Sequence, residues 1–181
     1  MVSITYFQMV IFISVVWLLI RGICWYRTKS LDWKREVQLL PVYICIVVVV
    51  RFTFCPFGKV DGQIQPLLFD SSKIFPFWLN LVPFLYLFDY PNLKDALVNL
   101  IGNMAMFIPL GIVWPAVFPK LDTHWKVIAA GMGASLCIEV LQLPFFGRSS
   151  DIDDLILNSA GYLAGYGIWL LWKKLTRKKT M

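Results

Sequence analysis

Three groups of polar side chains recur at helical spacing within the long apolar stretches of this sequence. Asn99 and Asn103 are one helical turn apart, and so, nearly, are Glu139 and Gln142. Carboxylates in an apolar setting can act as general acids or bases or bind a hard cation through oxygen, and amides can donate hydrogen bonds to a developing charge. The third group follows an i, i+3, i+7 stripe: Asp151, Asp154 and Asn158.

The composition places these groups in a membrane protein. Of 181 residues, 59% are hydrophobic and 15% are charged, whereas a soluble domain has roughly 45–50% apolar and about 25% charged residues. A chain this short buries a modest share of its surface, so a core cannot hide all of its apolar side chains. Many of them must face lipid, and this excludes an ordinary soluble enzyme.

Five segments are long and apolar enough to cross a bilayer, which takes about 20 residues per helix. We therefore predict an all-α fold: a polytopic integral membrane helical bundle with about five transmembrane helices. Residues 1–54 hold two N-terminal transmembrane helices, and residues 55–181 form a second unit with three more helices and a basic tail. The predicted spans are 3–20, 37–54, 96–118, 125–145 and 153–172.

The basic residues predict how the bundle is oriented. Most of the 17 Lys and Arg residues lie after the first span, around the third loop, or in the C-terminal tail. The positive-inside bias then places the N-terminus outside and the C-terminus inside. The net charge of +6 thus reflects topology, and we expect no nucleic-acid partner. The few cations on the opposite side are Arg51, Lys59, Lys73, Lys94 and Arg148.

Residues 74–88 are a further segment that could be taken for a sixth transmembrane helix. Their two prolines, short length and central Asn80 suit an interfacial or re-entrant element better than a crossing helix. A crossing there would also move the basic tail outside. Aromatic rings favour the membrane interface, and residues 74–90 carry several: Phe75, Phe77, Trp78, Phe84, Tyr86, Phe88 and Tyr90.

The alternating direction of the last three spans brings the three polar groups to one depth, in the outer part of the bilayer. A carboxyl at the centre of a spanning helix costs a few kcal/mol, which interhelical hydrogen bonds of about 0.6 kcal/mol each barely offset. A role in helix packing stays open, but a functional cavity is favoured. We expect one outward-facing polar cavity, lined by Asn103, Glu139, Gln142, Asp154 and Asn158, with Arg148 and Asp151 at its rim.

Other features favour structural interpretations. Small residues four apart, such as Gly161 and Gly165, predict close helix packing, and Pro109 predicts a kink. Lone His124 is expected to be a solvated loop residue, and Arg148 beside the aspartates can alternatively form a surface ion pair. The first two spans carry no motif, and we expect nothing there to bear on function. No Cys or His spacing indicates a zinc site, so no cofactor is expected, although three carboxylates with amides can hold a divalent cation.

Four linked motifs follow one another in the second half of the chain: NLVPF at 80–84, NLIGNMAMFIPLG at 99–111, EVLQ at 139–142 and RSSDIDDLILNSAG at 148–161. Together they resemble the VanZ family of membrane proteins. The match runs from Asn80 to Gly167, about half the chain, in the family's order and spacing. The resemblance implies a multi-pass protein of the bacterial cytoplasmic membrane that gives low-level resistance to teicoplanin and related lipidated glycopeptides. By resemblance, the family's polar positions fall on Asn80, Asn103, Glu139, Gln142, Asp151, Asp154 and Asn158.

Three classes of function remain open, of which the first is favoured. The favoured one is a non-enzymatic binding module for a membrane lipid, a lipid-linked cell-wall precursor or a lipoglycopeptide antibiotic. The second is an integral-membrane hydrolase or transferase acting on an envelope lipid, with Glu139 or Asp154 as the acid or base. It is disfavoured because no Ser/His/Asp set or Cys/His pair is present. The third is a lipid transporter or flippase component. The candidate ligand-binding residues are Asn80, Asn99, Asn103, Glu139, Gln142, Arg148, Asp151, Asp154 and Asn158.

Overall fold

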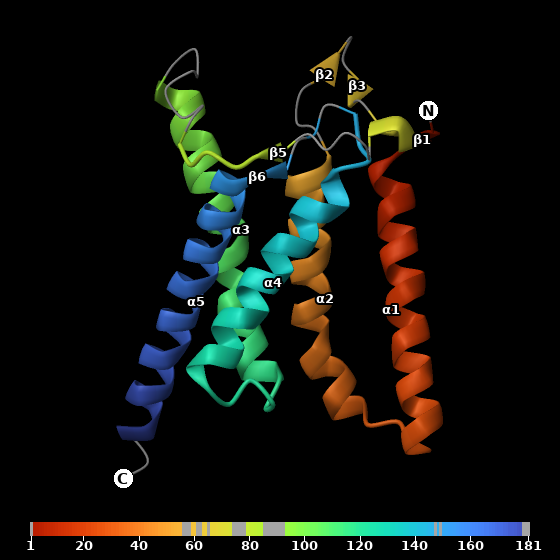
Figure 1. The fold of residues 1–181 in the computed structure, drawn as a ribbon. Coiled ribbons are helices and arrows are strands. Elements are labelled where there is room, and N and C mark those ends of the chain that lie inside the picture. The colour runs from red at the N-terminus through yellow and green to blue at the C-terminus, as the bar shows by residue number, and fades with distance from the viewer. Residues whose placement is uncertain are drawn as a thin grey trace.

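The structure, a computed structural model, describes residues 2–55, 59–60, 63–64, 66–73, 79–84, 93–146, 148 and 150–178. Within these residues five helices are long and apolar enough to cross a membrane (Figure 1). The predicted all-α membrane bundle of about five helices is therefore confirmed, while its orientation stays a prediction. The helices are α1 (Tyr6–Thr28), α2 (Trp33–Phe54), α3 (Leu93–Val117), α4 (His124–Gln142) and α5 (Ile152–Lys178).

Short strands gather at one end of the bundle, the end where the chain enters α1 and α5 (Figure 1). They pair as β1 with β4 and β2 with β3, both antiparallel, and as β5 with β6, which is parallel. None of these strands was predicted, because two or three residues are too few to show an alternating pattern. Their bounds are β1 Val2–Ile4, β2 Lys59–Val60, β3 Gln63–Ile64, β4 Leu67–Phe69, β5 Leu79–Asn80 and β6 Ser150–Asp151, with a 3-10 turn at Ser71–Lys73.

Local signals in the sequence explain where the first two helices begin. Thr5 and Gln8 form a reciprocal capping box at the start of α1, and the Asp32 side chain accepts a hydrogen bond from the backbone N–H of Arg35 at the start of α2. The Arg21 guanidinium contacts the Glu36 carboxylate with an Nε–Oε2 distance of 2.9 Å. This ion pair holds the two helices together at the end opposite the strands.

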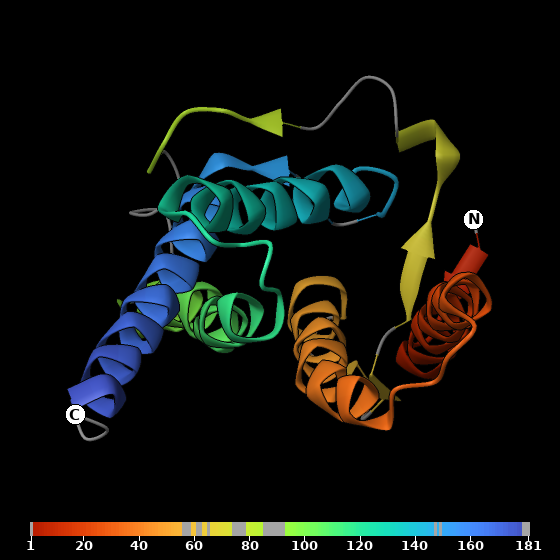
Figure 2. The same ribbon diagram turned by 90° about the horizontal axis from the view of Figure 1, so that it is seen from below.

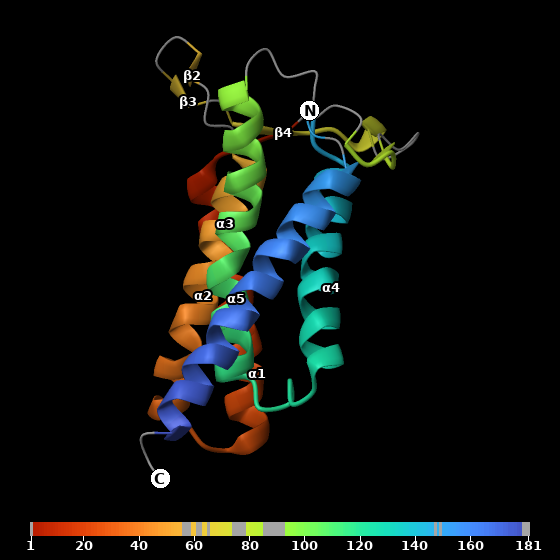
Figure 3. The ribbon, with the colours of Figure 1, turned by 90° about the vertical axis from the view of Figure 1, so that its left-hand side faces the viewer.

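The tightest helix contact in the bundle is between α3 and α5, which cross each other closely (Figure 3). A Cβ atom added to Gly161 would lie 2.0 Å from the backbone oxygen of Met104, and one added to Gly165 would lie 2.1 Å from that of Ile108. Small residues here let the two backbones touch, as the sequence predicted. α3 continues as one helix through Pro109.

The described core lies between α3, α4 and α5, with part of α2 packed against it. Phe107, Val127 and Tyr162 are almost fully buried there. α1 lies at the edge of the bundle beside α2 (Figure 2), and none of its residues is buried. α1 thus depends on lipid and on α2 for its environment.

His124 is exposed as expected, but it is the first residue of α4, and its Nδ1 lies 2.8 Å from the Tyr166 hydroxyl. The expectation of a purely solvated loop residue was therefore wrong.

Of residues 74–88, only 79–84 are described; they form β5 and a turn in which Phe84 has a φ of 60°. The other six aromatic residues of 74–90 lie outside the described residues.

Candidate functional site

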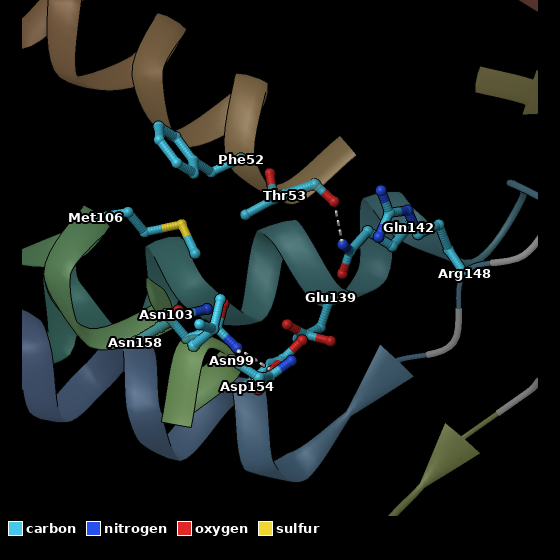
Figure 4. Close-up of a pocket in the computed structure, with 11 residues that line it drawn as sticks. Phe52, Thr53, Asn99, Asn103, Met106, Glu139, Gln142, Arg148, Asp154 and Asn158 are labelled. Atoms are coloured by element: carbon cyan, nitrogen blue, oxygen red, sulfur yellow. Dashed lines mark hydrogen bonds between the residues drawn. The ribbon is translucent and has the colours of Figure 1, made fainter. Parts of the chain in front are cut away.

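Polar side chains from α3, α4 and α5 face one cavity of about 520 Å³ near the strand end of the bundle (Figure 4). Their helical spacing places each set on one face, and the helices turn these faces toward each other. α2 supplies the remaining wall. The lining residues are Phe52, Thr53, Val98, Asn99, Asn103, Met106, Glu139, Gln142, Arg148, Asp154 and Asn158.

Two carboxylates stand next to each other in this cavity, and each has a different hydrogen-bond donor. Glu139 is 3% exposed, and its Oε2 accepts a hydrogen bond of 2.9 Å from the backbone N–H of Asp151. The Asp154 carboxylate accepts a hydrogen bond from the side-chain amide of Asn103. The Asn103 amide also lies 3.3 Å from Asn99 Oδ1, so the asparagine pair on α3 orients the acid on α5.

Two buried amide oxygens beside the carboxylates have no hydrogen-bond donor among the described residues: Gln142 Oε1 and Asn158 Oδ1. The amide nitrogens of both residues are occupied. Gln142 Nε2 donates to the backbone oxygen of Thr53 at 2.9 Å, and Asn158 Nδ2 donates to Ser135 Oγ at 3.2 Å. Gln142 is 5% exposed and Asn158 1%. An unsatisfied buried acceptor costs about 1–3 kcal/mol. The cavity therefore favours a ligand that donates hydrogen bonds to these two oxygens.

Arg148 reaches into the cavity from the segment between α4 and β6. Its Nη2 donates to the backbone oxygen of Phe54 at 3.1 Å, which satisfies a carbonyl at the end of α2 that has no partner in the helix. Burial lowers the pKa of this guanidinium, although an arginine keeps its charge. No ion pair between Arg148 and an aspartate is found in the described part of the chain; the surface ion pair proposed as an alternative is not seen.

Asn80 and Asp151 adjoin the cavity without lining it. The parallel pairing of β5 with β6 sets Asn80 opposite Asp151, and Asn80 Nδ2 donates to Asp151 Oδ1 at 3.1 Å. The backbone N–H of Asp153 donates to the same oxygen at 2.9 Å, and Asp153 Oδ1 accepts from the backbone N–H of Phe84 at 2.7 Å. These bonds tie residues 79–84 to the start of α5, while the Asp151 backbone holds Glu139.

The structure therefore brings seven of the nine predicted ligand-binding residues into the cavity wall and places the other two beside it. Four lining residues escaped the sequence reasoning: Phe52, Thr53, Val98 and Met106. Although the first two spans carry no motif and were expected not to bear on function, the end of α2 forms one wall of the cavity. None of the four left a signal in the sequence: Thr53 contributes its backbone oxygen to Gln142, and the other three look like ordinary lipid-facing or core residues.

No group of three or more His, Cys, Asp or Glu side chains able to hold a metal ion occurs among the residues that the structure describes. The oxygen atoms able to contact a hard cation are those of Glu139 and Asp154, with the free amide oxygens of Gln142 and Asn158. This set has two carboxylates and two amides, which with one oxygen from each side chain is fewer than the roughly 6–8 oxygen ligands of a calcium site.

The fold and the site define a multi-pass helical membrane protein with a buried, acid-containing cavity at one end of its bundle. A family model, VanZ/LLP1, matches residues 42–173, and the chain belongs to this family. The match begins within α2 and includes its end at the cavity. A search of curated proteins and a search of solved structures found no match.

Proposed function

We propose that this protein binds the polar headgroup of a lipidated or lipid-linked cell-envelope molecule in the cavity, at the outer leaflet of a bacterial cytoplasmic membrane. By binding such a molecule, the protein gives low-level resistance to teicoplanin and other lipidated glycopeptides. The observation that carries the proposal is the pair of buried acceptors without donors, Gln142 Oε1 and Asn158 Oδ1, beside two carboxylates. A ligand with hydroxyl or ammonium donors satisfies them.

The charge balance of the site supports a donor-rich or cationic headgroup. Among the described residues, Glu139 and Asp154 line the cavity with Arg148 as its one cation, and Asp151 and Asp153 stand directly behind them. Two buried acids face one guanidinium, and a buried carboxylate that it does not pair is costly in a low-dielectric site unless a ligand compensates the charge. Sugar hydroxyls and amines of envelope lipids and glycopeptides supply that compensation.

The isosteric variants Glu139→Gln and Asp154→Asn test this proposal in cells. At equal membrane levels each is expected to reduce the minimal inhibitory concentration of teicoplanin toward that of cells without the protein, because each replaces an acceptor oxygen by a donor or removes charge. Vancomycin, which lacks the lipid chain, serves as the comparison drug.

Asp122→Asn is the matched control, since Asp122 is exposed, pairs with Lys126 and lies at the opposite end of the bundle. It should protect as well as the native protein. Full protection by both Glu139→Gln and Asp154→Asn would contradict a role for the cavity.

The paired carboxylates also favour a second candidate, an integral-membrane hydrolase or transferase. Glu139 is held by a backbone N–H and Asp154 by a side-chain amide, so one acid can donate a proton while the other accepts one. Purified protein in lipid vesicles, incubated with a radiolabelled bacterial lipid extract, separates the two. A new product that Glu139→Gln fails to form indicates catalysis, and recovery of unchanged lipid indicates binding.

A further inference from the structure

An apolar groove of about 560 Å³ lies on the first three turns of α3. Its residues form two rows at i, i+4 spacing on one face of the helix, and most of them are exposed. All but the first two belong to the predicted membrane span Ala96–Val117. The groove residues are Leu93, Lys94, Leu97, Val98, Ile101 and Gly102.

The groove is continuous with the polar cavity through one residue, because Val98 lines both. Val98 is 64% exposed, and Asn99, the next residue of the same helix, faces the cavity (Figure 4). A polar surface thus passes into an apolar, lipid-facing surface around a single turn of α3.

The cavity wall has a buried polar part and an exposed part that carries apolar side chains. Glu139, Gln142 and Asn158 on α4 and α5 are buried, whereas Phe52 on α2 is 47% exposed and Val98 on α3 more so. Asn99, which also lines the cavity from α3, is exposed as well. The exposed part of the wall thus combines one amide with apolar side chains from α2 and α3, which suits a ligand that has both a polar and an apolar part.

We infer that the cavity takes the headgroup of an amphiphile whose acyl chain passes over Val98 and lies in the α3 groove. This inference rests on the proposed function and narrows its ligand class to molecules with a donor-rich headgroup and at least one acyl chain. In the bilayer the chain exchanges lipid contacts for groove contacts, so the groove orients the ligand more than it adds affinity. Lys94, at the end of the groove next to the start of α3, keeps its ammonium at the interface.

A photoreactive fatty acid tests this path. Cells expressing the full chain are fed a fatty acid with a diazirine near its methyl end, irradiated and lysed, and the adducts on the purified protein are mapped by mass spectrometry. Adducts should be enriched several-fold at Leu97, Val98 and Ile101 over Phe12 and Leu19, two exposed positions of α1. The adduct mass identifies the lipid.

Two variants separate a bound chain from ordinary bilayer contact. Val98→Trp fills the passage and should abolish the enrichment at Leu97 and Ile101, while Val140→Trp, at an exposed position of α4, should leave it unchanged. Asp154→Asn should also remove the enrichment, because this substitution weakens binding of the headgroup in the cavity and leaves the groove residues unchanged. All three proteins are compared at equal membrane levels.

Uniform labelling of α1 and α3, or enrichment that persists in both Val98→Trp and Asp154→Asn, would overturn the inference. Loss of teicoplanin protection in Asp154→Asn combined with uniform labelling would reject the groove and keep the cavity. Full protection by that variant combined with Asp154-dependent labelling would show that teicoplanin protection does not depend on the cavity, and would keep a lipid in the groove.

Discussion

Asn80 is a residue outside the cavity that helps to shape it. Its side-chain amide holds the Asp151 carboxylate, and the Asp151 backbone N–H holds Glu139. A substitution at position 80 therefore acts on Glu139 through an intermediate residue, whereas a substitution at position 154 acts on the cavity directly.

We predict that Asn80→Ala lowers stability by about 1 kcal/mol, the usual contribution of one hydrogen bond, and partly reduces teicoplanin protection. Asn80→Asp should be more severe, because it places a second carboxylate against Asp151. Thermal unfolding in detergent and inhibitory concentrations measure the two effects. Full protection by Asn80→Asp would show that the contact between β5 and β6 does not position Glu139.

The Arg148 guanidinium has two roles: it donates a hydrogen bond to the Phe54 carbonyl, and it brings a positive charge to the cavity. Arg148→Met removes the donor to the Phe54 carbonyl and should destabilise the protein by about 1–3 kcal/mol, the cost of a buried acceptor without a partner. Arg148→Lys keeps the charge but loses the planar fork, so it should recover part of that stability. If Arg148→Met melts like the native protein, the end of α2 is not held by this residue.

At the scale of elements, the contact between α3 and α5 fixes the relative height of Asn103 and Asp154. Gly161→Ala would place a Cβ 2.0 Å from the Met104 carbonyl oxygen. We predict a loss of about 1–3 kcal/mol, as for other overpacked interiors, together with weaker teicoplanin protection, because the two helices must separate.

Gly167→Ala on the same helix is the matched control, since nothing lies within 4 Å of its added Cβ. It should leave stability unchanged or raise it by up to about 1 kcal/mol through helix propensity. Unfolding of both variants in the same detergent provides the comparison. Equal stability of Gly161→Ala and Gly167→Ala would contradict a close α3–α5 contact.

The elements also show where sequence reasoning succeeds and where it fails. Helical periodicity and span direction placed Asn103, Glu139 and Asp154 at one depth, because helices of 19 to 27 residues leave a repeated signal. The β5–β6 pairing left none, so only the family resemblance pointed to Asn80. Thr53 could not be predicted because it contributes a backbone oxygen to Gln142, and any residue type has one.

At the scale of the whole molecule, the proposed function depends on which side of the membrane the cavity faces. The strands and the N-terminus share one end of the bundle, and the turn between α3 and α4 lies at the other (Figure 1). The cavity is at the strand end, because its lining residues include Gln142 at the end of α4 and Asp154 at the start of α5. Lys173 and Lys174, near the C-terminal end of α5, belong to the opposite end. The positive-inside bias thus predicts that the cavity opens toward the outer leaflet, where glycopeptides and envelope precursors are met.

Single cysteines test this orientation in a background in which Cys24, Cys45, Cys55 and Cys137 are replaced. Ser71→Cys, exposed at the strand end, should react with a membrane-impermeant maleimide in intact cells, whereas Thr123→Cys, exposed beside the start of α4, should react only after permeabilisation. The reverse pattern would put the cavity at the cytoplasmic leaflet. A headgroup bound there would never meet an extracellular antibiotic, so the resistance proposal would fail even though the cavity and its acids remained as described.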